Sequence, residues 1–179
     1  MNQPVAAISE LVAARVREVA DFPQAGVVFK DITPLLADAA AFQTTVEYLG
    51  QSLLASGAEV VVGIEARGFV LAAPAAVAAG IGFVPQRKPG KLPGMTLSQA
   101  YALEYGEAAL EMHCDAIKPG QKVAIIDDVL ATGGTAQAAA LLVERAGGQV
   151  LGCTFLIELV ALQGRAKLPG RKIESLLLA

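Results

Sequence analysis

Two adjacent aspartates and a glycine-threonine loop are the part of this sequence best suited to chemistry. Asp127 and Asp128 follow an apolar run, and residues 131–135 read Ala-Thr-Gly-Gly-Thr. Ionised carboxylates only accept hydrogen bonds, which suits them to sugar hydroxyls or to a hard cation. Threonine hydroxyls can donate to an anion, and glycines let the backbone approach it closely. The segment therefore predicts a site for a phosphorylated sugar.

The neighbouring elements would place this loop at the start of a helix. Residues 123–126 form an apolar run typical of a strand buried on both faces, and apolar residues recur with helical spacing over 138–142. N–H groups at a helix N-terminus can hold a phosphate. The segment lacks the lysine of a triphosphate-binding loop and the glycine spacing of a dinucleotide-binding loop, so neither of those classes is indicated.

The rest of the chain alternates helical and β patterns. Helical spacing of apolar residues predicts one helix over 8–19 and another over 42–54. Runs of β-branched residues predict strands at 60–64, 83–86, 123–126 and 150–159. This alternation predicts an α/β fold, with a mainly parallel central sheet flanked by helices.

Composition favours a compact enzyme made of a single domain, 1–179. Of its residues, 54% are hydrophobic and 17% are charged, which is enough apolar material for one core. Its length of 179 residues is too short for two ordinary domains. A net charge of −3 argues against nucleic acid as a partner. The uncharged segment 68–86 is broken by prolines and glycines, so we expect a helix and a strand there and no membrane span.

The cysteines and the first residues bear on the compartment. Cys114 and Cys153 have neither a disulfide framework nor metal-ligand spacing, and we expect both to be buried, reduced thiols. Residues 1–10 lack the basic start and apolar core of a secretory signal. Together these features predict a cytoplasmic location.

A basic, irregular stretch over 87–107 is the longest segment without clear periodicity. Its cations Arg87, Lys88 and Lys91 could neutralise a diphosphate, although a solvated basic loop is the ordinary interpretation of such a cluster. Arg67 stands where a strand gives way to a helix, and it is either a further diphosphate ligand or an ordinary helix-start arginine. We expect 87–107 to be a flexible functional loop.

Several motifs together resemble the type I phosphoribosyltransferase family, and within it the adenine phosphoribosyltransferases. Segment 127–135 resembles the family's phosphoribosyl-diphosphate signature. Further similar motifs follow in the family's order at 21–34, 65–69, 87–94, 103–106 and 158–159. The resemblance implies a small base-side hood formed with the N-terminal helix by residues 1–34, and a flexible lid at 87–107.

The resemblance also implies a role for each matched position. Catalysis would depend on Glu104 and Arg67. Adenine would be bound by Val28, Phe29, Lys30 and Leu159, with Phe29 and Leu159 on the two faces of the base and the main chain of the other two on its edge. Phosphoribosyl diphosphate would be bound by Arg67, Arg87, Lys88, Lys91, Tyr105, Asp127, Asp128, Ala131, Thr132, Gly133, Gly134 and Thr135.

The implied reaction makes AMP and diphosphate from adenine and 5-phosphoribosyl 1-diphosphate, as in purine salvage. Mg²⁺ would be the cofactor, held by substrate and water with no direct protein ligand. A homodimer is expected, and neither nucleic acid nor a membrane is expected as a partner. The sequence departs from the family pattern at Lys30, Glu65 and Gln86, where arginine, aspartate and an aliphatic residue are frequent.

Ala131 bears on which base is used. Relatives that act on 6-oxopurines have an aspartate there and a lysine on the strand after the phosphate helix, but residues 154–160 contain no lysine. Alanine cannot exchange a proton, so the resemblance leaves Glu104 to do so. Three alternatives stay open: a transferase for another purine, a regulatory protein of the same fold, and an interaction protein with a vestigial site.

Overall fold

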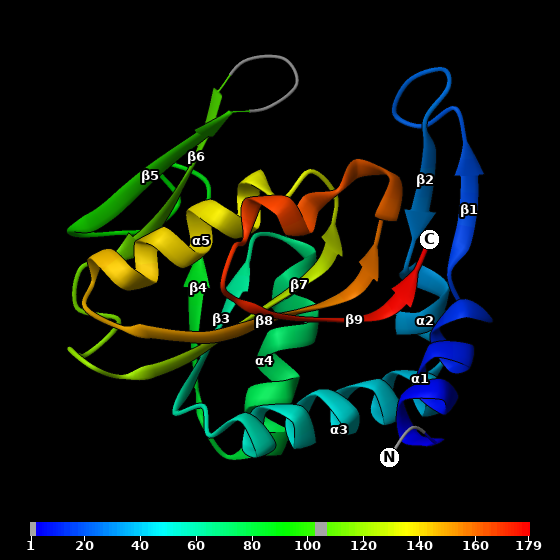
Figure 1. The fold of residues 1–179 in the computed structure, drawn as a ribbon, viewed down its shortest axis with the longest axis horizontal. Coiled ribbons are helices and arrows are strands. Elements are labelled where there is room, and N and C mark those ends of the chain that lie inside the picture. The colour runs from blue at the N-terminus through cyan, green and yellow to red at the C-terminus, as the bar shows by residue number, and fades with distance from the viewer. Residues whose placement is uncertain (1–2, 103–106) are drawn as a thin grey trace.

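A parallel sheet forms the centre of the structure, a computed structural model that describes residues 3–102 and 107–179 (Figure 1). The strand order is β4 (Gly82–Gln86), β3 (Val60–Ile64), β7 (Lys122–Leu130), β8 (Gln149–Glu158) and β9 (Lys172–Leu178). Every neighbouring pair runs parallel, so all five strands end at the same edge. The loops that follow the strands converge there, which is where sheets of this kind bind ligands.

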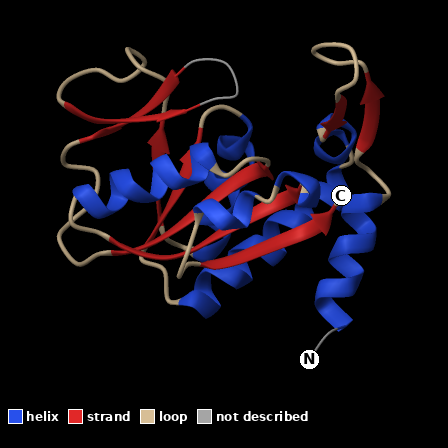
Figure 2. Ribbon diagram, turned by 45° about the horizontal axis from the view of Figure 1, so that its top comes forward, coloured by secondary structure: helices blue, strands red, loops and turns tan. Residues whose placement is uncertain are grey.

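Helices cover both faces of the sheet (Figure 2). One face carries α1 (Gln3–Ala13), α2 (Thr33–Ala37), α3 (Ala39–Ser56) and α4 (Arg67–Ala79), and the other carries α5 (Gly134–Arg145). Side chains of a strand point alternately to the two faces. In β3, Val61 belongs to the core under α3 and α4, whereas Val62 belongs to the core under α5. This double burial explains why the strand is apolar at every position.

Two antiparallel hairpins rise beyond the edge at which the sheet strands end (Figure 1). One pairs β1 (Arg17–Ala20) with β2 (Val28–Asp31), and the other pairs β5 (Thr96–Ala102) with β6 (Glu107–His113). At the base of the first, Asp31 accepts a hydrogen bond from the N–H of Thr33 at 2.9 Å and pairs with Arg17. The N–H of Thr33 is the main reason that the pKa of Asp31 falls to about 2.

Most of the predicted elements are confirmed. The strands expected at 60–64, 83–86 and 150–159 and the helix expected at 42–54 correspond to β3, β4, β8 and α3. The strand expected at 123–126 is longer than predicted, because β7 continues to Leu130. Asp127 and Asp128 therefore lie within the central strand and not after it.

Three predictions about local structure were wrong. The first helix ends at Ala13, and residues 17–20 of the expected helix form β1. β5 occupies 96–102 of the stretch expected to be irregular, because Leu97 and Tyr101 lie on the same face of it and pack on the core under α5. Cys153 is buried as expected, and its burial raises its pKa to about 12, but Cys114 is exposed.

The uncharged segment 68–86 divides into most of α4 and β4, as expected. Among the helices of the described residues, none is long and apolar enough to cross a membrane.

The packing of α4 on the sheet can be tested with one core and one surface truncation. Leu71 is fully buried, so Leu71→Ala should lower the free energy of unfolding by about 2–5 kcal/mol through lost burial and a cavity. Val77 on the same helix is 82% exposed, so Val77→Ala should change it by less than about 0.5 kcal/mol. Urea denaturation measures both, and equal losses in the two variants would contradict this packing.

Candidate active site

A cleft opens at the edge where the sheet strands end. Its volume is about 340 Å³. It is lined by residues from the β3–α4 turn, β5, β7 and the loop before α5, namely Glu65, Ala66, Arg67, Tyr101, Asp127, Asp128, Val129, Ala131 and Thr135. The structure thus brings Arg67, the two aspartates and part of loop 131–135 together, as the sequence predicted.

The two aspartates form a buried pair. Asp127 is 9% exposed and Asp128 is 5% exposed, and Oδ1 of Asp127 accepts a hydrogen bond from the N–H of Asp128 at 2.9 Å. Burial, and then the charge of Asp128, raise the pKa of Asp127. Burial also raises the pKa of Asp128, although Arg67 acts in the opposite direction. A ligand that donates hydroxyl hydrogen bonds would stabilise the charged forms of this pair.

Arg67, the first residue of α4, connects this pair to the first hairpin. Its Nε lies 2.6 Å from Oδ2 of Asp128, although its N–H is not aligned for a hydrogen bond. Its guanidinium carbon lies 4.9 Å from the centre of the Phe29 ring. The next residue, Gly68, is a site residue that the sequence prediction missed: a Cβ there would lie 2.7 Å from Oδ1 of Asp127. Only a glycine lets α4 begin this close to β7.

Loop 131–135 encloses a second, smaller hollow of about 70 Å³ beside the cleft. Its lining includes Asp127, Ala131, Thr132, Gly133 and Thr135. α5 begins at Gly134, and within the described part of the chain no side chain caps its first N–H groups. A hollow that combines uncapped helix N–H groups with threonine hydroxyls can bind a phosphate.

The basic loop does not reach the cleft. Arg87 forms an ion pair with Glu65 at 3.3 Å and donates to the carbonyl of Lys91 at 3.1 Å. The N–H of Lys88 donates to the same carboxylate at 2.8 Å, and the side chains of Lys88 and Lys91 are exposed. Burial acts to raise the pKa of Glu65, but Lys88 and Arg87 outweigh it and lower that pKa. Glu65 thus holds the loop at the rim of the cleft.

Three of the predicted base-binding residues lie on the first hairpin in different settings. Phe29 is half-buried and packs edge-on against Phe22, with ring centres 5.1 Å apart. The side chain of Lys30 is paired with Glu18, the residue opposite it on the neighbouring strand. Val28 is half-exposed on the same strand.

Leu159 lies after β8 and is half-buried. Its N–H donates to the carbonyl of Leu130 at the end of β7, at 2.9 Å, which fixes Leu159 close to loop 131–135. Glu104 and Tyr105 lie outside the described residues. Tyr101 is the described residue of the second hairpin that lines the cleft. Its spacing of four from Leu97, which puts both on one face of a strand, is the sequence signal that could have indicated it.

Gln86, one of the departures from the family pattern, is fully buried at the end of β4. Its Nε2 donates to the carbonyl of Ala139 in α5 at 3.1 Å. The side chain therefore connects β4, the strand before the basic loop, to α5.

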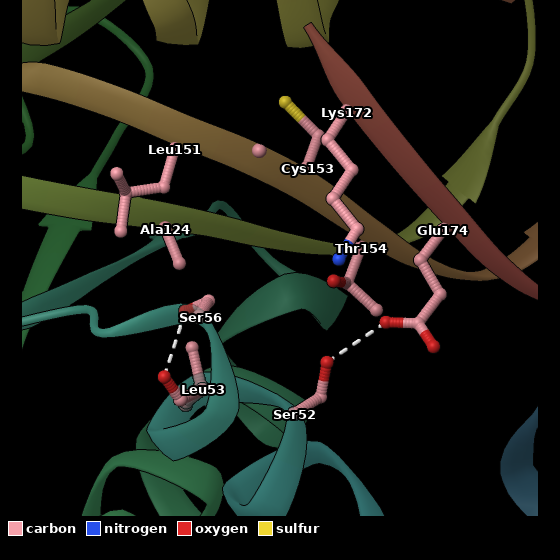
Figure 3. A pocket seen from close by; sticks show the side chains of 10 residues that line it. Ser52, Leu53, Ser56, Ala124, Leu151, Cys153, Thr154, Lys172 and Glu174 are labelled. Carbon is pink, nitrogen blue, oxygen red and sulfur yellow. Dashed lines mark hydrogen bonds between the residues drawn. The ribbon is translucent and has the colours of Figure 1, made fainter.

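Another hollow lies on the face of the sheet that α3 covers, between α3 and strands β8 and β9 (Figure 3). Its volume is about 30 Å³, room for about two waters at ~10–15 Å³ each. The hydroxyls of Ser52 and Tyr48 donate to Glu174 at 2.8 and 2.6 Å. Burial, followed by Glu174, raises the pKa of Tyr48. These contacts fasten α3 to β9, so we assign this hollow a structural role.

Comparisons with known proteins agree with this geometry. The model of the phosphoribosyl transferase domain matches residues 36–172. An adenine phosphoribosyltransferase of Acidothermus cellulolyticus is 55% identical over 174 residues, covering 97% of this chain and 98% of the relative. One from Streptomyces coelicolor is 54% identical and covers 99% of both chains.

Solved structures of adenine phosphoribosyltransferases are similar to this chain over almost their whole length. The adenine phosphoribosyltransferase of Thermoanaerobacter pseudethanolicus superposes with a TM-score of 0.92 at 51% identity, covering 96% of this chain and 99% of that one. The Saccharomyces cerevisiae enzyme, complexed with an imino-altritol bisphosphate and adenine, superposes with a TM-score of 0.90 at 36% identity, with the same coverage.

The buried aspartate pair should cost stability at neutral pH. The pKa of Asp127 is raised above the 3.8 of an unfolded aspartate, so folding loses stability as the pH rises above 3.8 through the raised pKa. Asp127→Asn keeps the acceptor for the N–H of Asp128 and removes the charge. We expect its Tm at pH 7 to exceed the wild-type Tm, by about 2–4 °C for each kcal/mol of relieved repulsion.

Thermal unfolding between pH 4 and 8 measures this effect. The Tm difference should widen as the pH rises, and a difference independent of pH would contradict the prediction. Glu65→Gln is the matched control of opposite sign. Because the pKa of Glu65 is lowered, its carboxylate stabilises the fold above the 4.5 of an unfolded glutamate. This variant should therefore be less stable than wild type by a constant amount near neutral pH and approach wild type only as the pH falls below 4.5.

Proposed function

Because the chain belongs to the adenine phosphoribosyltransferase family, we propose that it transfers the 5-phosphoribosyl group from 5-phosphoribosyl 1-diphosphate to N9 of adenine, giving AMP and diphosphate. The observation that carries this proposal is the full-length similarity to such enzymes, combined with a cleft that holds Arg67, Asp127 and Asp128 next to an uncapped helix N-terminus. The chain is thus a glycosyltransferase of purine salvage.

The aspartates and the loop would bind the phosphoribosyl group. Asp127 and Asp128 would accept hydrogen bonds from the two ribose hydroxyls, which would favour their ionised forms against the burial that raises their pKa values. The 5-phosphate would occupy the hollow of about 70 Å³, against the N–H groups and hydroxyls of residues 131–135. The proximity of the hollow to the cleft supports this division of the substrate.

Arg67 would stabilise the leaving group. As the bond from C1 of the ribose to diphosphate breaks and the bond to N9 forms, positive charge develops on the sugar and negative charge on the diphosphate. A guanidinium at the cleft wall favours that separation. Arg87, Lys88, Lys91 and Tyr105 would add to the diphosphate site, which requires Arg87 to leave Glu65 for the substrate. The attraction of Arg87 to the diphosphate would offset the loss of its pair with Glu65.

The base would lie between the first hairpin and the end of β8. Phe29 and Leu159 would contact its two faces, and the main chain of Val28 and Lys30 would bind its edge. The pairing of the Lys30 side chain with Glu18 supports a main-chain role at that position. Adenine loses a proton on forming AMP, and Glu104 would accept it, with Arg67 as the second catalytic residue.

The donor set of the cleft fits Mg²⁺ as a complex with the substrate. Mg²⁺ prefers six oxygen ligands and retains several waters. One oxygen of Asp127 is already bonded to the N–H of Asp128, and Asp128 is paired with Arg67, so substrate phosphates and water would supply most ligands. When bound, the ion would neutralise diphosphate charge. The family resemblance also supports a homodimer, and the unpaired Cys114 and Cys153 support a cytoplasmic location.

Steady-state assays across bases test the function. With 5-phosphoribosyl 1-diphosphate and Mg²⁺, we expect AMP from adenine, and values of kcat/KM for hypoxanthine, guanine and xanthine lower by about 10²-fold or more. The physical reason is that no aspartate at position 131 or lysine over 154–160 serves a 6-oxopurine. Addition of EDTA should stop turnover and excess Mg²⁺ should restore it. A preference for a 6-oxopurine, or no product from any base, would overturn the proposal.

The proton acceptor can be tested by a substitution that keeps size and removes charge. Glu104→Gln should lower kcat by about 10²-fold or more, because the amide cannot take the proton. Glu10→Gln, on the exposed side of α1, is the matched control and should keep wild-type kcat. Wild-type activity of purified Glu104→Gln would remove Glu104 from the mechanism.

A further inference from the structure

The segment after β8 lies directly against the phosphate loop. Two short helical turns, η1 (Val160–Leu162) and η2 (Gly164–Lys167), follow β8, and η2 begins with a buried glycine. A Cβ on Gly133 would lie 2.2 Å from the carbonyl oxygen of Gly164. A Cβ on Gly164 would lie 2.3 Å from the carbonyl oxygen of Ala131. The two backbones therefore touch, and neither position has room for a side chain.

The backbone on both sides of this contact is in an uncommon conformation. Gly133 has a φ of 82° and Gln163 has a φ of 52°, both in the left-handed region. For Gln163, which is not a glycine, this conformation is unfavourable and persists only where the surroundings impose it. Something other than local preference must hold Gly164 against the loop.

An ion pair between a buried carboxylate and a half-exposed arginine supplies that constraint. Glu158, at the end of β8, is 5% exposed and accepts from Arg165 of η2 twice, at 2.7 and 2.6 Å. Ser175 of β9 donates to the same carboxylate at 2.6 Å, and Arg165 also donates to the carbonyl of Ile173 at 3.2 Å. Bidentate pairs of this kind fix geometry as well as supply energy. They hold Arg165, and with it the adjacent Gly164, to the end of β8 and to β9.

A second attachment lies on the other side of η2. Leu168 is 1% exposed and packs in the core under α5, together with Leu130 and Ala136. Gly164 is therefore fixed from both directions, by the ion pair and by this apolar anchor. The segment that contacts loop 131–135 is therefore held in place by contacts within the fold itself.

We propose that Gly164 is a positioning residue for the 5-phosphate loop, and that the Glu158–Arg165 pair keeps it in contact with Ala131 and Gly133. The absence of a side chain at 164 lets loop 131–135 take the shape that receives the phosphate. This proposal rests on the proposed function for the identity of the substrate, but the contact itself belongs to the fold.

The test compares two glycine-to-alanine variants of the full chain. Gly164→Ala should push the loop from its position, and we expect the Kd for ribose 5-phosphate and the KM for 5-phosphoribosyl 1-diphosphate to rise about tenfold or more. The KM for adenine should stay at its wild-type value. Gly82→Ala is the matched control, because a Cβ there meets only Cγ2 of Val60 at an ordinary 3.5 Å, and it should behave as wild type.

Calorimetry with ribose 5-phosphate and steady-state kinetics give the two readouts. Unchanged phosphate affinity in folded Gly164→Ala, or an equal rise in both KM values, would overturn the proposal. Arg165→Lys keeps the charge and loses the two-point contact, and it should raise the same Kd by a smaller factor. If Gly164→Ala does not fold, an unchanged Kd in Arg165→Lys would overturn the proposal.

The failure of the proposed function has a different signature. A wild-type chain that binds ribose 5-phosphate but makes no AMP would contradict the function and leave the positioning role to be decided by the variants. A wild-type chain that does not bind ribose 5-phosphate at all would overturn the positioning role itself.

Discussion

The burial of two negative charges at the end of the central strand is the constraint on which the site depends. Asp127 and Asp128 lie in β7, where β8 pairs beside Asp127 and the start of α4 packs against it, so that the two residues are only 9% and 5% exposed at the wall of the cleft. Burial of adjacent carboxylates is unfavourable unless a partner offsets it. Arg67 and the N–H of Asp128 offset part of this cost, and a diol ligand would offset more. The fold thus holds a destabilised pair in readiness for a ligand.

Close backbone contacts make this arrangement possible. Gly68 lets α4 begin against Asp127, and the contact between Gly133 and Gly164 fixes the loop that follows β7. These contacts belong to the rigid sheet and its helices, whereas the two hairpins stand outside it at the open edge (Figure 1). The structure therefore separates the region around Asp127 and loop 131–135, where we propose that the phosphoribosyl group binds, from the more peripheral segments that carry Phe29 and the basic loop.

Patterns with a local cause could be predicted from the sequence. Four of the five sheet strands and α3 follow from short apolar runs and helical spacing, and loop 131–135 follows from its glycines and threonines next to a helix. The first helix was predicted too long, because Val16 and Val19 continue its helical spacing, whereas residues 17–20 form a strand by pairing with β2, which no local pattern indicates. β9 was missed because its burial comes from β8 and α1, which no local pattern reveals.

The sequence by itself determined the fold class, the adjacent aspartates and the glycine-threonine loop that follows them, because these depend on residue types within a few positions of one another. Arg67 lies 60 positions before Asp127, and only the family resemblance joined it to them. The tertiary structure alone decided that Arg87 pairs with Glu65, that Gly68 borders Asp127, and that Gly164 supports the loop. Each of those contacts joins residues that are 22 to 59 positions apart, or depends on a missing side chain, and only packing brings such positions together.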